Sequence, residues 1–452
     1  MSEVFRYCGP SDLAAASRVS QFWRRAAFFR LHYTITIRKF PHLETLLSRL
    51  ESEKADHDLR IGLCLRSLSL IMNHTNVAGK DLWFEWKDNN ALAARVYSVM
   101  SKLIQLEGLR WMTHSKYLSP PDIFGHCRNA CPNLRWIHIA ITNWVHNPRT
   151  THPRNPVWFN RSKEVGAIAT CIELVGEQTS DTLDEFLWMI RILPGLVNLS
   201  IKIPGRLSAA DFLCQLNYPL SKLRSLSLEG EWPTPERDID SMSEDSLGSF
   251  FRQHPNLTKV FLRWNRSRRR QVVPPFDAAL VSSLFPSLTH FAGPIQICMG
   301  LVSSRLADQL KFLAIDRETR ASAPEGSVSP ILTLVQMARP LPNLKRLDLD
   351  RHYTVTHSYD TSYYIDESTL EALLAITPAL TQLYTGMYIG QWEEIIPLVG
   401  YVPDLIRLVV LLNDDYPPEF VYSRGHIRFV REMEEELRVI CPDITLGIRL
   451  VC

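Results

Sequence analysis

The chain has 452 residues, enough for two or three ordinary domains or for one elongated repeat domain. It is 46% hydrophobic and 22% charged, a balance typical of a folded protein, and its net charge of +2 gives no overall bias toward nucleic acid or membrane. No apolar run of about 18 residues and no secretory signal pattern is present, so we expect no membrane partner. Nine scattered cysteines predict reduced, buried thiols in a cytoplasmic or nuclear protein.

The first forty residues carry a helical pattern that differs from the rest of the chain. Ser11 follows Pro10 and is suited to cap a helix. The apolar residues of this helix share one side and are Leu13, Ala16, Val19, Phe22, Trp23 and Ala26. Such a segment would shield the apolar edge that the first unit of a repeat domain leaves open.

The same segment resembles the F-box, a small helical module, over the module's central and final parts. The matching residues are Phe5, Asp12-Leu13, Val19, Trp23-Arg24 and Ala27, followed by the strand-like LHYTITI. The family's Leu-Pro-x-Glu helix start is missing ahead of Phe5, and Ser20 stands where the family often has cysteine. The resemblance implies that residues 1–40 form a partial F-box-like module that docks onto the Skp adaptor of a cullin–RING ubiquitin ligase. The adaptor-binding residues that it implies are Phe5, Leu13, Val19 and Trp23.

Amphipathic helical patterns recur in the remainder of the chain. One of them places Leu92, Val96, Val99, Met100 and Leu103 on a single helix face. Two others begin with a capping box, in which a hydroxyl residue precedes glutamate by three positions. These boxes are Thr182 with Glu185, before the stripe of Leu183, Phe186, Leu187 and Ile190, and Ser368 with Glu371, before Leu370, Leu373 and Leu374.

A short skeleton, Pro-x-Leu-x-x-Leu-x-Leu, follows several of these helices. Its clearest copies are CPNLRWIHIA (131–140), LPGLVNLSIK (193–202), HPNLTKVFLR (254–263) and LPNLKRLDLD (341–350). The proline ring excludes the helical conformation from the residue before it and therefore ends the helix. The alternation of apolar and polar residues that follows predicts a short strand with one buried face.

The repeated skeleton predicts one parallel sheet. Its clearest strands are expected near 134–139, 196–203, 223–229, 257–263, 344–349 and 405–410. With further copies such as FPSLTHFAG and TPALTQLYT, and with weak units at Leu65, Leu106, Cys171 and Leu310, the units number roughly thirteen. The pattern resembles the leucine-rich repeat in its long, irregular form with a helix in each unit. This resemblance implies that residues 41–452 form an α/β solenoid, with parallel strands on one face and helices on the other.

No motif typical of catalysis or of phosphate binding is present in the sequence. His126, Cys127 and Cys131 lie close together but lack a fourth zinc ligand, and Cys131 takes an apolar position of the skeleton. We therefore expect a protein that is not an enzyme and has no metal and no cofactor. Residues 263–271 (RWNRSRRRQ) are suited to grip phosphates, but a solvated or protein-binding loop is favoured over nucleic-acid binding.

The residues between the skeleton leucines are expected to line the open face of the sheet. The predicted substrate-protein-binding residues are Trp136, His138, Lys202, Glu229, Arg263, Asp348 and Asp350. This face should turn from aromatic to acidic along the chain, so the expected partner carries a basic patch opposite the C-terminal units. Loops 143–162, 351–366 and 413–426, rich in Tyr, Trp, His, Arg and Pro, are expected to overhang it.

Two functional hypotheses follow from these patterns. In the first, the protein is the substrate receptor of an SCF-type cullin–RING ubiquitin ligase, with residues 1–40 holding the adaptor and cullin complex and the repeats holding an unknown protein substrate. In the second, it is a leucine-rich-repeat interaction scaffold without a link to a ligase. The missing Leu-Pro-x-Glu segment favours the second hypothesis.

Overall fold

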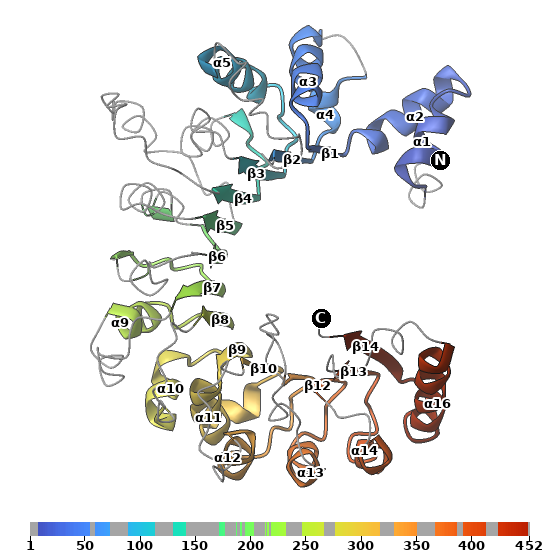
Figure 1. Cartoon of the computed structure of the whole chain (residues 1–452). Coiled ribbons are helices and arrows are strands. Elements are labelled where there is room, and N and C mark those ends of the chain that lie inside the picture. The colour runs from blue at the N-terminus through green and yellow to red at the C-terminus, as the bar shows by residue number, and fades with distance from the viewer. Residues whose placement is uncertain are drawn as a thin grey trace, which may run out of the picture. The chain divides into compact units, whose positions relative to one another are not determined.

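The structure is a computed structural model in which the chain divides into two compact units, unit 1 (Met1–Leu223) and unit 2 (Arg224–Cys452). The residues it describes are 8–54, 59–72, 89–113, 130–141, 171–176, 187, 190–191, 195–202, 213, 215–216, 218–231, 246–265, 276–316, 330–349, 367–386, 392–412 and 424–450. Both units combine helices with parallel strands (Figure 1). The mixed α/β class predicted from the sequence is confirmed.

Unit 1 begins with two helices and continues as alternating strands and helices. Its described elements are α1 (Pro10–Ala16), α2 (Gln21–Leu31), β1 (Thr34–Ile37), α3 (Phe40–Ser52), α4 (Ile61–Cys64), β2 (Ser67–Met72), α5 (Asn89–Met100), β3 (Gly108–Thr113), β4 (Trp136–Ile141), β5 (Cys171–Gly176) and β6 (Asn198–Lys202). Each strand from β1 to β6 pairs in parallel with the next strand along the chain. Helices α3 and α5 lie next to each other on the same side of these strands (Figure 1).

Unit 2 repeats this arrangement with a helix before most strands. Its described elements are β7 (Ser225–Glu231), α9 (Ser246–Gln253), β8 (Lys259–Asn265), α10 (Ala278–Leu284), β9 (His290–Pro294), α11 (Ile295–Ser303), the 3-10 helix η6 (Arg305–Gln309), β10 (Phe312–Asp316), α12 (Pro330–Met337), β11 (Arg346–Asp348), α13 (Glu367–Ala375), β12 (Gln382–Gly386), α14 (Trp392–Val399), β13 (Arg407–Leu412), α16 (Arg424–Ile440) and β14 (Thr445–Leu450). Strands β7 to β14 pair in parallel in chain order.

The proline skeleton forms a turn that precedes the strand. The N–H of Leu257 donates to the carbonyl oxygen of His254 at 3.1 Å, and Leu344 donates to Leu341 at 3.2 Å. The same bond joins Leu134 to Cys131, Leu288 to Phe285, Leu380 to Thr377, Leu405 to Val402 and Ile444 to Cys441. Because this turn must close first, β8 begins at Lys259, and the predicted strands began two residues too early.

A second hydrogen-bond pattern joins each turn to the one before it. The carbonyl oxygen of Thr258 accepts from two successive N–H groups, those of Thr289 at 2.9 Å and His290 at 3.0 Å. The same double acceptance occurs at the carbonyls of Tyr33, Arg66, Glu107, Arg224, Thr289, Lys311, Lys345 and Thr381. A carbonyl oxygen has two lone pairs, so this contact satisfies two backbone donors and fixes the register before the ladder begins.

The core lies between the strands and the helices, where the skeleton leucines are buried. Val96, Val99 and Met100 of α5 are buried as predicted, and so is Leu103, which lies beyond the end of the helix. Cys171 aligns with Trp136 at the first strand position, not at the turn position expected for it. The register of strand and turn was therefore harder to predict than the buried face of the helix.

One of the two predicted capping boxes lies within the described residues. Ser368 lies inside α13, which begins at Glu367, so it does not take the N-cap position expected for it. Leu370, Leu373 and Leu374 of the stripe behind it are buried as predicted. The box at Thr182 and Glu185 lies outside the described residues.

The N-terminal pattern forms two helices, where the sequence predicted one. Gly9 is the N-cap of α1, and its N–H donates to the Asp12 carboxylate at 3.1 Å, so the capping role predicted for Ser11 is wrong. Ser20 caps α2 by accepting a hydrogen bond from the N–H of Trp23 at 3.2 Å. The turn between the two helices divides the predicted apolar stripe.

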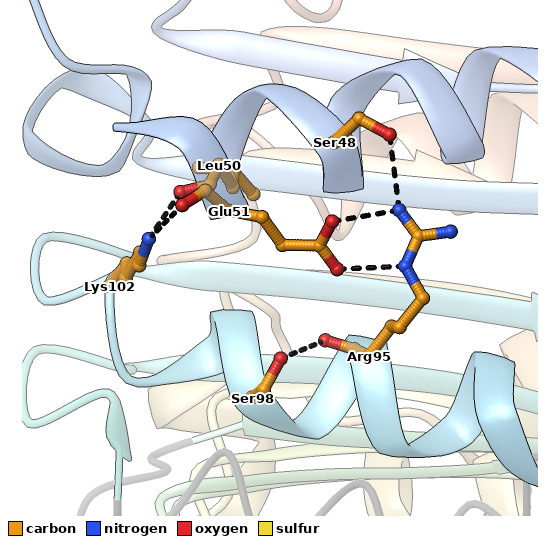
Figure 2. A network of polar contacts seen from close by, with 6 residues as sticks. All are labelled: Ser48, Leu50, Glu51, Arg95, Ser98 and Lys102. Atoms are coloured by element: carbon orange, nitrogen blue, oxygen red, sulfur yellow. Dashed lines mark hydrogen bonds and ion pairs between the residues drawn. The ribbon is translucent and has the colours of Figure 1, made fainter. Parts of the chain in front are cut away.

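A polar network joins helices α3 and α5 on the surface of unit 1 (Figure 2). Arg95 Nε donates to Glu51 Oε1 at 2.7 Å, and its Nη2 donates to Glu51 Oε2 at 2.9 Å and to Ser48 Oγ at 3.1 Å. Lys102 Nζ donates to the carbonyls of Leu50 at 2.6 Å and Glu51 at 3.0 Å, near the C-terminal end of α3. The network therefore connects α3 and α5 through charged groups at their partly exposed edges.

The Arg95–Glu51 pair should make a small, acid-sensitive contribution to stability. The hydrogen bond from Arg95 lowers the pKa of Glu51, so the contribution is present above the unfolded pKa of this carboxyl and is lost as pH falls through the folded value. Because the pair is partly exposed, Glu51→Gln should lower the free energy of unfolding by about 0.5 kcal/mol at pH 7 and by less at pH 3. Urea unfolding at both pH values, with the exposed Glu435→Gln as control, measures this. An equal loss at both values would contradict it.

The turn leucine should carry much of the stability of its unit. Leu344 is fully buried, and Leu344→Ala should lower the free energy of unfolding by about 2–5 kcal/mol. Lys345→Ala, which removes only an exposed side chain next to it, should change the free energy by less than about 0.5 kcal/mol. Denaturant titration distinguishes the two variants, and similar losses for both would contradict the role of the leucine.

Candidate protein-binding surfaces

The N-terminal helices enclose a small core of their own. Leu13 of α1 and Ala27 of α2 are buried against each other, with Cys8, Ala16 and Ala26 packed around them. Leu13, which the family resemblance places in the adaptor contact, therefore packs inside the module.

The outer side of α2 and the turn before it carry exposed apolar residues. Val19 is 71% exposed, Phe22 58% and Trp23 37%. Phe29, seven residues after Phe22 and so on the same helix face, is exposed as well. Large apolar side chains gathered on one exposed face are typical of an interaction site. We call Val19, Phe22, Trp23 and Phe29 the N-terminal apolar surface; Phe5, also predicted here, lies outside the described residues.

On the open face of unit 1, Trp136 covers the neighbouring strand. Trp136 of β4 aligns with Gly108 of β3. A Cβ atom at Gly108 would lie 1.9 Å from the indole Cε2, so only glycine leaves room for the ring there. His138 lies on β4 and Lys202 on β6, but their side chains are outside the described residues.

On the open face of unit 2, a row of side chains crosses the sheet at the first position of each strand. In register order from β8 to β13 this first-position row contains Lys259, His290, Phe312, Arg346, Gln382 and Arg407. The row follows directly from the turns, because the strand begins two residues after each turn leucine.

Rings and guanidinium groups contact one another along this row and along the next open-face position of the strands. The rings of Phe261 and Phe312 meet edge to face at 6.0 Å. The Arg346 guanidinium carbon lies 5.1 Å from the centre of the Phe312 ring and 4.4 Å from that of Tyr384. The Arg407 guanidinium carbon also lies near Tyr384, 5.7 Å from the centre of its ring. Cation–π contacts of this kind hold the arginine side chains in fixed positions.

From β9 to β13, the next open-face position along the strands is closed to solvent. The buried residues there are Ala292, Ala314, Asp348, Tyr384 and Val409. From β9 to β13, the described open-face side chains with exposed surface therefore belong to the first-position row and the turns before it.

Asp348 differs from the sequence prediction. Its side chain lies on the predicted face, but the residue is only 8% exposed, and its carboxylate lies 3.6 Å from Nη2 of Arg346. Asp350 lies outside the described residues. The expectation that the face becomes acidic toward the C-terminal units is therefore wrong for the described side chains, where the charged groups of the row are Lys259, Arg346 and Arg407.

Two other predicted residues pair with each other. Glu229 of β7 aligns with Arg263 of β8, and Arg263 Nη1 donates to Glu229 Oε2 at 3.1 Å. The remainder of the arginine-rich segment after Asn265, as well as the predicted overhanging loops 143–162 and 351–366, lies outside the described residues. The same holds for loop 413–426, apart from the first residues of α16.

The first-position row lies in a positive environment. Burial lowers the pKa of His290, and the nearby Lys259 and Lys311 lower it further. The sequence did not lead to this row, because the prediction for unit 2 was based mainly on residues that alternate with the strand leucines, such as Asp348. Aligning HPNLTK, FPSLTH, LPNLKR and VPDLIR would have found it, since the residue two places after each turn leucine is large and polar.

The skeleton cysteine takes a structural position. Cys131 is fully buried in the turn before β4, with its Sγ 3.7 Å from the Met100 carbonyl, as expected for the apolar slot of the skeleton. His126 and Cys127 lie outside the described residues. Within the part of the chain that the structure describes, no cluster of three metal-binding side chains occurs and no helix has the length and apolarity to cross a membrane.

Comparison with known proteins adds no relative to this picture. No protein-family model matches the chain, and no curated protein matches it significantly. The N-terminal apolar surface and the first-position row are thus identified from the residues and their geometry.

The close packing of Trp136 on Gly108 predicts a compensating pair of substitutions. Gly108→Ala should destabilise unit 1 by about 1–3 kcal/mol, because the added methyl group displaces the indole. In a Trp136→Ala background the same substitution should cost less than about 0.5 kcal/mol. Denaturant unfolding of the four proteins of this cycle measures the difference. Equal costs in both backgrounds would contradict the contact.

Proposed function

We propose that this protein is a substrate receptor of a cullin–RING ubiquitin ligase, built from an F-box-like module followed by leucine-rich repeats. The N-terminal helices would hold the Skp adaptor, and the open face of the sheet would hold a protein substrate. Ubiquitin transfer would be carried out by partner enzymes, so the chain itself needs no catalytic group.

The repeat assignment is supported by the recurrence of one local structure. Most of the described repeats have a turn with a buried leucine, a short parallel strand and, in most cases, a helix on the opposite side. The double hydrogen bond at the carbonyl that precedes a strand occurs in both units. A chain in which no single unit buries its own leucines is stabilised by stacking on its neighbours, as in a solenoid.

The observation that carries the adaptor proposal is the N-terminal apolar surface. Val19 and Trp23, which the family resemblance places in the adaptor contact, are exposed. They do not belong to the small core that Leu13 and Ala27 form in the same module. Phe22 and Phe29 extend the same apolar surface along α2. Exposed aromatic side chains are typical anchors of protein interfaces.

A scaffold without a ligase link is the second candidate. The burial of Leu13 favours this candidate, because a side chain that packs in the module's own core does not contact an adaptor. In that case the N-terminal apolar surface would dock onto a protein other than the adaptor.

Co-purification with a recombinant Skp adaptor tests the proposal. The full chain should capture the adaptor, and Val19→Asp or Trp23→Ala should weaken capture at least tenfold, because each removes apolar contact area at the centre of the surface. His42→Asp, an exposed substitution on α3, should leave capture unchanged. The melting temperature of Val19→Asp should stay within about 2 °C of the wild type.

Two results would contradict the ligase assignment. One is the absence of adaptor capture both by this chain and by a version carrying an added Leu-Pro-x-Glu helix. The other is capture that persists undiminished in the Val19→Asp and Trp23→Ala variants. The first result would leave the scaffold hypothesis in place.

A further inference from the structure

We propose that the first-position row of unit 2 binds an acidic segment of a partner protein in an extended conformation. This inference rests on the proposed function, because it names the chemistry of the substrate that the sheet would hold. It replaces the basic-patched partner expected from the sequence, since the described charges at this end of the sheet are positive.

The charge of the row and its turns favours a negatively charged partner. The exposed or partly exposed cations from β8 to β13 are Lys259, Lys311, Lys345, Arg346 and Arg407. Over the same described turns and first positions, the acidic residues are Asp308 and Asp404. Positive charge therefore predominates along the strip, and opposite charges steer and align an interface.

Arg346 is held in a way that suits carboxylate recognition. Its guanidinium lies between the rings of Phe312 and Tyr384, which orient its plane. Its contact with Asp348 is long, at 3.6 Å, and its Nε is buried without a hydrogen-bond partner among the described residues, so the exposed part of the guanidinium is the part that a ligand can reach. The side chain remains 39% exposed. A planar guanidinium that is held between two rings and keeps part of its surface exposed is suited to bind carboxylates.

The spacing of the cations favours an extended chain over a single phosphate group. The charges lie on several strands, and adjacent strands are about 4.8 Å apart, so the strip from β8 to β13 measures roughly 24 Å. A bound phosphate needs donors that converge on one point. An extended peptide advances about 3.3 Å per residue, so about seven residues cover the strip and bring several carboxylates to it.

The rings provide the second part of the recognition. Phe261, His290 and Phe312 form a cluster in which the His290 and Phe312 rings lie 6.1 Å apart and nearly parallel. Both His290 and Phe312 keep part of their surface exposed. Apolar side chains interleaved among the carboxylates of the partner would contact these rings, which gives the site a preference beyond charge alone.

Fluorescence anisotropy with the full chain tests the proposal. The probe is a fluorescein-labelled ten-residue peptide of alternating glutamate and serine, compared with a lysine–serine peptide and with a serine peptide carrying one phosphoserine. The glutamate peptide should bind best, and raising the salt concentration from 50 to 300 mM should weaken its binding about tenfold.

Matched charge variants place the binding on the row. Arg346→Gln and Arg407→Gln should each weaken binding of the glutamate peptide about 5- to 20-fold. Arg431→Gln removes the same charge from the exposed surface of α16 and should change binding less than twofold. Arg346→Lys, which keeps the charge but loses the planar fork, should lie between Arg346→Gln and the wild type. Circular dichroism of each variant establishes that it is folded.

Several outcomes would overturn the inference. They are equal binding of the glutamate and lysine peptides, no binding of the glutamate peptide at 1 mM, stronger binding of the phosphoserine peptide, and equal effects of Arg346→Gln and Arg431→Gln. If the chain captures the Skp adaptor but fails these tests, only the inference of an acidic partner is contradicted. A chain that passes them but captures no adaptor contradicts only the ligase assignment.

Discussion

Before most of the described strands, the carbonyl oxygen of the preceding residue accepts two N–H groups, one from the next turn and one from the first residue of the next strand. The placement of side chains in both units depends on this contact. In unit 2 the Lys311 carbonyl receives the N–H groups of Lys345 and Arg346. The contact aligns first strand positions before the ladder begins, so that Phe312 and Arg346 become neighbours across strands. Without that alignment, the cation–π series from Phe261 to Arg407 would not exist, since one residue of slip sends each side chain to the opposite face.

The turn that supplies these N–H groups tolerates different residues at its buried position, provided that their polar atoms are satisfied. His254 is buried there and its Nδ1 donates to the Phe250 carbonyl at 2.6 Å, while burial lowers its pKa. Thr377 takes the same position and donates to the Leu373 carbonyl at 3.0 Å. Both side chains bond to the end of the preceding helix, so the turn also fixes how that helix packs. These hydrogen bonds explain why the residue before the proline of the skeleton can be polar, as at His254 and Thr377, and still be buried.

The helix faces and the parallel strands could be predicted because the spacing of apolar residues reports burial directly, as for Val96 and Val99. The start of each strand could not, because Leu257 belongs to a turn whose hydrogen bonds leave no mark in the apolar pattern. The single helix side predicted for Leu13, Val19 and Trp23 does not form, since a helix break before Ser20 divides the stripe and leaves Leu13 buried and the other two exposed. Asp348 alternates with leucines as predicted, yet its burial depends on neighbours that its own strand does not reveal.

Amide hydrogen exchange of the full chain, followed by mass spectrometry, tests most directly whether the double acceptance at the strand-preceding carbonyls holds each unit together. The amides of Leu344, Lys345 and Arg346 should exchange as slowly as those of the strand residues that follow, because all are held by hydrogen bonds in the core of unit 2. The turn amides before β8 and β13 should behave in the same way. Turn amides that exchange as fast as those of an unstructured peptide, beside protected strands, would contradict the account.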